Sequence, residues 1–262
     1  MSATDTTGKR ITAAVRQTGY RRLILGFDHH EESRTVLAIA EQVAVTAQLE
    51  LTGIFVEDSE LFELAALPFS TEFLIKTRRR QSFDLQCVER ELRTHILASQ
   101  AALQQMARRA HRAFSFRTVR GRLLRALMQE ASAGDLIMLR RADKPWHTTA
   151  IVGGHSVHAP VLQVLPPAVD EAAPLVALGQ QIAQQLGRPL IRLTASTAEI
   201  VETTAREVGA ALIILPLELL SEKPWQEELE LFADRVPSTV LIAGIPAQGG
   251  SDSDMSKDHS PA

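Results

Sequence analysis

The chain has 262 residues, of which 45% are hydrophobic and 23% are charged, as is usual for a folded globular protein. This composition excludes a largely disordered, collagen-like or disulfide-scaffold chain, and the length suits two domains of about 100–150 residues each. The net charge of −3 conceals an uneven distribution, with balances of −5 over residues 1–75, +10 over 76–141 and −8 over 142–262.

The basic middle segment is rich in arginine, which suits phosphates, nucleic acids and acidic protein surfaces equally well. A run of charge is most often a solvated helix face that pairs with acidic groups of the same chain. No zinc-ligand spacing, helix-turn-helix signature or aromatic-interleaved basic motif accompanies it, so nucleic acid is not an expected partner. The single cysteine, Cys87, has no second cysteine with which to form an internal disulfide.

The first part of the chain alternates predicted strands and helices. A strand at 21–28 is followed by a helix at 31–48, whose apolar residues recur at helical spacing, and by a strand at 49–56. Neighbouring parallel strands need a crossover of about a dozen residues, so this unit predicts a parallel sheet. The next predicted elements are a helix at 85–113, a strand at 114–119, a helix at 121–133, and strands at 135–139 and 160–165.

The pattern then repeats in shortened form. The predicted elements are a helix at 174–186, a strand at 189–193, a helix at 197–208 that Gly209 ends, a strand at 211–216, a helix at 225–235 and a strand at 239–243. The segment GDLIML matches GAALIILP, and APVLQVL matches PSTVLIAG. The strand at 160–165 therefore either ends the first sheet or begins the second.

These elements divide the chain into an N-terminal extension (1–20), a first α/β domain (21–165), a second, shortened α/β domain (166–246) and a polar, disordered tail (247–262). The first ten residues lack the apolar core of a secretory signal. The longest run without Asp, Glu, Lys or Arg, 145–169, contains four prolines and is not a membrane span. We expect a cytoplasmic protein.

Three local motifs resemble those of a tandem universal stress protein. The first strand ends in Asp28, the second ends in Phe55-Val56-Glu57-Asp58, and the segment 134–139 resembles the family's A-D-L-I-V-x-G. The resemblance implies an α/β fold of two universal stress protein-like (adenine nucleotide alpha hydrolase-like) parallel-sheet sandwich halves in tandem, the second shortened. It also implies an internal pseudo-dimer of the two halves, or a homodimer.

Some family members bind ATP at the carboxyl ends of the strands, where such sheets generally place ligands. The resemblance assigns the adenosine contacts to Asp28 and Val56. The family's phosphate-binding glycines are absent after the strand at 135–139 and again at 216–221. Because glycine lets backbone N–H groups approach phosphate oxygens, we expect ATP binding to be lost and no cofactor to be required. Arg140 is a candidate substitute that would bind the phosphates by charge.

An apolar insert at 57–74 separates the second strand from the long helix. Exposed apolar patches mark interaction sites, so the insert is a candidate for binding a protein partner. The alternative is that it packs on its own sheet or on the second half. The candidate partner-binding residues are Leu61, Phe62, Leu67, Phe69 and Phe73.

The loop histidines His147, His155 and His158, with His29 and His30 after the first strand, lack the cysteine or acidic partners of a zinc site, so no metal is expected. No nucleophile elbow, Walker-type loop or dinucleotide fingerprint occurs, and no catalytic residues are assigned.

Together these features predict a non-enzymatic regulatory or stress-response protein that acts through protein–protein contacts. The alternative is a small-ligand sensor that binds an adenine nucleotide or another anion at Asp28, Val56 and Arg140. A hydrolase acting on such a nucleotide is a third, weaker hypothesis, because no base–nucleophile pair is present.

Overall fold

The computed structural model describes most of the chain between residues 19 and 244. The described ranges are 19–28, 34–74, 78–139, 159–166, 173–195, 197–221, 223–236 and 238–244. The predicted N-terminal extension, except for its last two residues, and the predicted tail lie outside them. So do Arg140 and the histidines considered for a metal site.

Within the described residues, eight strands form one continuous sheet in the order β5-β2-β1-β6-β10-β9-β7-β8. They are β1 (Arg22–Phe27), β2 (Glu50–Asp58), β5 (Phe114–Gly121), β6 (Asp135–Leu139), β7 (Val161–Leu165), β8 (Leu190–Thr194), β9 (Leu212–Pro216) and β10 (Thr239–Ala243). The four strands of each half are mutually parallel, and the halves meet where β10 pairs antiparallel with β6. The strands of the first half therefore run in the opposite direction to those of the second half, and the carboxyl ends of the two sets of strands point in opposite directions.

The placement of β7 corrects the predicted boundary at residue 165. This strand pairs in parallel with β8 on one side and β9 on the other, so it belongs to the second half of the sheet. The position beside β6, where a fifth strand of the first half was expected, is taken by β10. The matching of the β7 sequence with the β10 sequence therefore does not reflect equivalent positions in the sheet.

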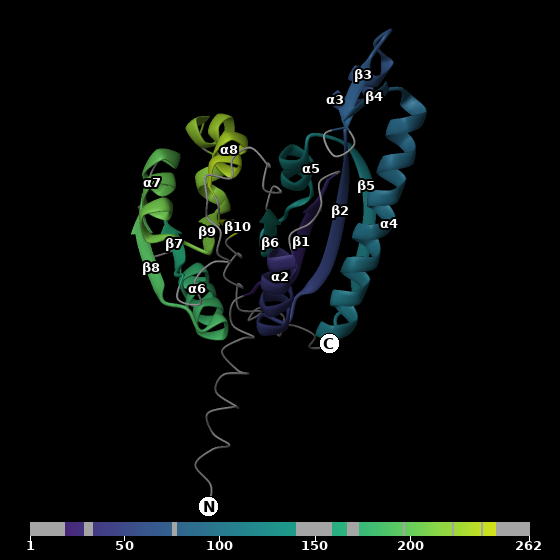
Figure 1. Cartoon of the computed structure of the whole chain (residues 1–262). Coiled ribbons are helices and arrows are strands. Elements are labelled where there is room, and N and C mark those ends of the chain that lie inside the picture. The colour runs from purple at the N-terminus through teal and green to yellow at the C-terminus, as the bar shows by residue number, and fades with distance from the viewer. Residues whose placement is uncertain are drawn as a thin grey trace, which may run out of the picture.

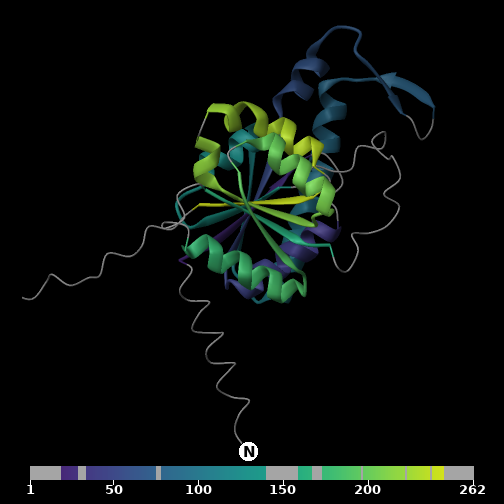
Figure 2. The ribbon, with the colours of Figure 1, turned by 90° about the vertical axis from the view of Figure 1, so that its left-hand side faces the viewer.

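Helices cover both faces of this sheet, as Figures 1 and 2 show. One face carries α2 (Arg34–Thr46), α4 (Leu85–Ala110) and α6 (Ala173–Leu186). The other carries α5 (Leu123–Glu130), α7 (Ala198–Val208), the 3₁₀ helix η3 (Leu217–Ser221) and α8 (Lys223–Arg235). Helix α2 contacts α4 of its own half and also α6 of the other, so the two halves share one helical layer.

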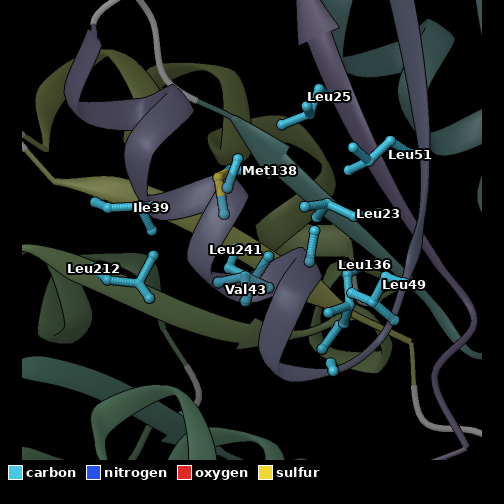
Figure 3. Packing of buried hydrophobic residues seen from close by; sticks show 14 of the residues in the cluster. Leu23, Leu25, Ile39, Val43, Leu49, Leu51, Leu136, Met138, Leu212 and Leu241 are labelled. Carbon is cyan, nitrogen blue, oxygen red and sulfur yellow. The ribbon is translucent and has the colours of Figure 1, made fainter. Parts of the chain in front are cut away.

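Side chains alternate between the two faces along each strand, as β-structure requires. In β1, Leu23 and Leu25 lie in the cluster under α2, whereas Ile24 lies in the cluster under α5. Figure 3 shows Leu136 of β6 and Leu241 of β10 within the first cluster, so both halves contribute to it. The core is therefore continuous across the β6–β10 junction.

Most predicted helices and strands are confirmed with small changes at their ends. The long helix ends at Ala110 because His111 adopts a left-handed conformation (φ 52°). Thr197 is the N-cap residue of α7, but its side chain makes no capping hydrogen bond. Asp84 caps α4 by accepting a hydrogen bond from the Cys87 N–H, which lowers the pKa of the Asp84 carboxyl.

The insert between β2 and α4 contains a short helix, α3 (Ser59–Ala66), and a two-stranded antiparallel sheet of β3 (Thr71–Leu74) and β4 (Arg79–Ser82). These strands were not predicted, because runs of four residues show too little alternation. Both views show the hairpin projecting beyond the sandwich.

Candidate functional site

The root of the insert is attached to the end of the edge strand β5. The guanidinium of Arg120 lies 4.0 Å from the centre of the Phe62 ring and 3.3 Å from a Glu57 carboxylate oxygen. Arg122 forms a second ion pair with Glu60 of α3, at 2.7 Å. Each exposed ion pair stabilises by no more than about 1 kcal/mol, but together with the cation–π contact they fix where the insert leaves the sheet.

The tip of the insert exposes large apolar side chains. Its most exposed member is Phe69, 97% exposed, in the turn between α3 and β3. The other three are Leu64, Leu67 and Phe73, at 52%, 57% and 57%. We call these four residues the apolar tip.

The turn that presents Phe69 is held by specific hydrogen bonds. The Ser70 hydroxyl lies 2.8 Å from the Leu64 carbonyl oxygen and 3.0 Å from that of Leu67. Phe69 itself has a φ of 65°, a left-handed conformation that is rare for a bulky residue. Unfavourable backbone conformations cost about 1–3 kcal/mol and cluster at functional sites. A strained backbone holding a fully exposed aromatic ring is the strongest local sign of an interaction site in the described residues.

The five predicted partner-binding residues fall into a partly buried group and an exposed group. Leu61 and Phe62 are partly buried against the core, so for them the alternative of packing on the body of the protein is correct. Leu67, Phe69 and Phe73 are exposed, and all three belong to the insert. Leu64 is exposed as well, and no signal in the sequence indicated this, because its spacing of three from Leu61 would place both residues on one face of the helix.

Several arginines of the basic middle segment pair with acidic groups of the same chain, as the interpretation of the charge run expects: Arg109 on α4, Arg117 and Arg120 on β5, and Arg122 just after it. Arg109 binds both carboxylate oxygens of Glu41, which raises the pKa of the Arg109 guanidinium. Arg117 pairs with Glu130 from α5. Arg78 and Arg80 in the hairpin differ, because both are exposed and neither has an ion-pair partner among the described side chains.

The predicted nucleotide-binding residues fall at the carboxyl ends of the first-half strands. Asp28 follows β1 directly, and Phe27 is the register partner of Phe55, so Asp28 lies beside Val56. The Val56 side chain, however, is only 1% exposed and lies in the cluster that includes Leu127 of α5. A ligand could therefore reach Val56 only through its backbone. The third candidate, Arg140, lies outside the described residues.

Helix α5 packs very closely on β1 near this position. A Cβ atom added at Gly26 would come within 2.5 Å of a Leu127 methyl carbon and 3.0 Å of a Leu123 methyl carbon. Gly26 therefore permits close helix–strand packing, and this observation points to a packing role and not to a phosphate-binding one.

Asp135, part of the motif at 134–139, is a structural residue. It is 5% exposed and pairs with Arg22 at 2.6 Å. It also accepts a hydrogen bond from the Ser132 N–H, and Arg22 in turn donates to the Glu130 carbonyl. This buried carboxylate is fully paired, as buried charges must be, and it ties β6 to β1.

The described part of the chain contains no cluster of metal-ligating side chains and no membrane-spanning helix. No group of three His, Cys, Asp or Glu residues there is arranged to hold a metal ion. No described helix is long and apolar enough to cross a membrane. Cys87 is half-buried at the start of α4.

No family model and no curated protein match the chain. Solved structures that resemble it include a universal stress protein from Archaeoglobus fulgidus (10% identity, 87% of this chain and 98% of that chain, TM-score 0.49). A putative universal stress protein from Pseudomonas aeruginosa is 11% identical, with 86% of this chain and 94% of that chain covered and a TM-score of 0.46. The functionally unknown protein PA1789 from Pseudomonas aeruginosa is 11% identical, with 86% of this chain and 93% of that chain covered and a TM-score of 0.47. These structural neighbours are in part universal stress proteins, but at such identities and TM-scores they assign neither a ligand nor a reaction to the chain.

Proposed function

We propose that this chain is a non-enzymatic, universal stress protein-like regulatory protein of the cytoplasm that acts by binding another protein through its apolar tip. The observation that carries this proposal is the tip itself: an aromatic ring 97% exposed on a strained backbone, held in place by the Ser70 hydroxyl. Aromatic side chains supply much of the binding energy in protein interfaces, and a ring that is 97% exposed adds almost nothing to the buried core.

The motifs that carry the family resemblance support the proposal through their positions. Asp28 follows the first strand, Glu57 and Asp58 end the second, and 135–139 is the strand beside the first, all as the resemblance implies. Within the same proposal, the two halves form an internal pseudo-dimer joined at the β6–β10 pair, and ATP binding has been lost with the glycines.

Site-specific photo-crosslinking tests the protein contact. A benzoylphenylalanine in place of Phe69 should form one discrete protein adduct in living cells, and the adduct should disappear when Phe73→Asp is added. The matched control places the same crosslinker at Leu231, which is 53% exposed on α8 in the second half of the sheet. Adducts of equal yield and pattern from both positions, or none from Phe69, would refute the proposal.

The second candidate function is a sensor for an adenine nucleotide, favoured by the register that places Asp28 beside Val56. Its test is mass spectrometry of small molecules released from denatured protein, with melting scans in ATP, ADP and AMP. A stoichiometric nucleotide, or a melting shift that Asp28→Ala abolishes, would establish the sensor. Neither signal is expected if the non-enzymatic protein-binding function is correct.

A further inference from the structure

We infer that the open edge of β4 binds an extended, acidic segment of a partner protein, with apolar side chains at alternate positions, as a third strand of the hairpin sheet. This inference rests on the proposed function, because it specifies the chemistry of the partner that the apolar tip contacts. It depends on three features of the hairpin: an unpaired strand edge, unpaired arginines and adjacent exposed aromatic rings.

The strand edge is available for pairing. Within the described residues, β3 and β4 pair only with each other, through four registered residue pairs from Thr71–Ser82 to Leu74–Arg79. An isolated two-stranded sheet is only marginally stable in water. A third strand would complete backbone hydrogen bonds that this edge leaves open, which is how extended peptides add to sheets.

The side chains beside this edge select an acidic, apolar segment. Phe73 and Arg80 are direct cross-strand partners, so their side chains lie on the same face of the hairpin, and both are exposed. A strand added next to β4 would place its own side chains beside Arg80 on that face. Arginine there favours Asp or Glu, and the ring of Phe73, with Phe69 nearby in sequence, provides apolar contact area.

The charges of the hairpin also favour the β4 edge over the β3 edge as the binding site, and a different protein over a second copy of this chain as the partner. The other edge belongs to β3, whose one charged residue is Glu72, so this strand offers no cation to an acidic segment. Pairing β4 with the β4 of another copy would gather the arginines of both strands in one four-residue ladder, which is unfavourable, and charged edge residues are a common device against such self-pairing. An acidic strand of a different protein is the complementary occupant of the β4 edge.

The test uses the full chain and a fluorescein-labelled peptide of alternating glutamate and valine, with a lysine-for-glutamate peptide as control. Binding is measured by anisotropy. The wild-type protein should bind the acidic peptide and not the basic one, and Arg78→Glu with Arg80→Glu should weaken binding by about tenfold or more, since attraction becomes repulsion. The matched variant, Arg93→Glu with Arg108→Glu, has the same net charge at two exposed positions on α4 and should stay within about twofold of wild type.

Hydrogen exchange then distinguishes strand addition from general charge attraction. Saturating acidic peptide should slow exchange of the amides at 79–82 and leave those of α4 unchanged, while circular dichroism and melting confirm that each variant is folded. Equal weakening by both double reversals, binding of the basic peptide, or unchanged exchange in β4 would overturn the inference. So would a dimer, in sedimentation of the protein alone, that the Arg78→Glu and Arg80→Glu changes dissociate.

The peptide test can fail without contradicting the proposed function, which the crosslinking experiment tests. A discrete protein adduct from position 69, together with failure of the peptide test, would leave the protein contact intact and refute only the acidic, extended partner. Absence of the adduct would refute the protein contact itself.

Discussion

At the scale of single residues, Tyr20 is unusual because it is the one tyrosine of the chain and is 7% exposed. Burial raises the pKa of its hydroxyl above the ordinary value of 10.0, and the negative charge of Glu218 adds to the effect. The hydroxyl has no hydrogen-bond partner within the described residues. Since burial disfavours the charged phenolate, the folded protein holds this proton more tightly than the unfolded chain.

This predicts a stability that falls in strong base. Because the pKa is raised in the folded state, the contribution is fully present below pH 10.0 and is lost as pH rises from there toward the folded-state pKa. Ultraviolet titration should therefore show tyrosinate only as the protein unfolds. The Tyr20→Phe variant is the control: it should give no such absorbance change and should lose this part of the pH dependence. Reversible titration near pH 10 in protein that keeps its native circular dichroism would contradict the prediction.

At the scale of elements, two helices end in the same way with different residues. Helix α4 ends at His111 (φ 52°), whose N–H donates to the carbonyls of Ala107 and Arg108. Helix α7 ends at Gly209 (φ 61°), with the equivalent pair of hydrogen bonds. A left-handed conformation costs an L-residue about 1–2 kcal/mol but costs glycine almost nothing. A Cβ at Gly209 would meet no atom within 4 Å, so its substitution reports the backbone alone.

The two caps should respond in opposite directions. His111→Gly should raise the free energy of unfolding by about 0.5–1 kcal/mol, and Gly209→Ala should lower it by about 1 kcal/mol. Urea unfolding curves with unchanged slopes would measure both effects. If both changes lowered the free energy of unfolding, the left-handed backbone conformation alone would not explain the stability of the two caps.

At the scale of the whole molecule, the β6–β10 pair and the contact of α2 with α6 make one core from two halves. Leu241 lies at this junction, opposite Met138, and is fully buried. Leu241→Ala should lower the free energy of unfolding by about 2–5 kcal/mol through the cavity that it leaves.

Because the core is shared, this loss should lower the stability of both halves together. Calorimetry should show one transition at a lower temperature, and hydrogen exchange should accelerate equally in β1 and β9. Leu231→Ala, at an exposed position of α8, should change stability by less than about 0.5 kcal/mol. Two separated transitions, with only the second half affected, would show instead that the halves fold independently.

Local patterns in the sequence determined most of the elements of this protein. Apolar spacing predicted α2 and α4, and a short apolar run predicted each of β1, β6 and β9, because these signals depend on residues close together in the chain. Gly209 marked the end of α7 for the same reason. For Phe69 the apolar insert left two alternatives open, exposure at a partner-binding surface or packing on the body of the protein, and the structure shows exposure.

The partners of those elements were decided only by the tertiary structure. A buried apolar strand such as β7 satisfies its backbone equally well beside any parallel neighbour, so its sequence could not assign it to one half. The same is true of β10, whose antiparallel pairing with β6 joins the halves through hydrogen bonds between residues about a hundred positions apart. The pairing of Arg120 and Arg122 with the root of the insert likewise depends on contacts distant in sequence. Such contacts form only when the whole sheet is assembled.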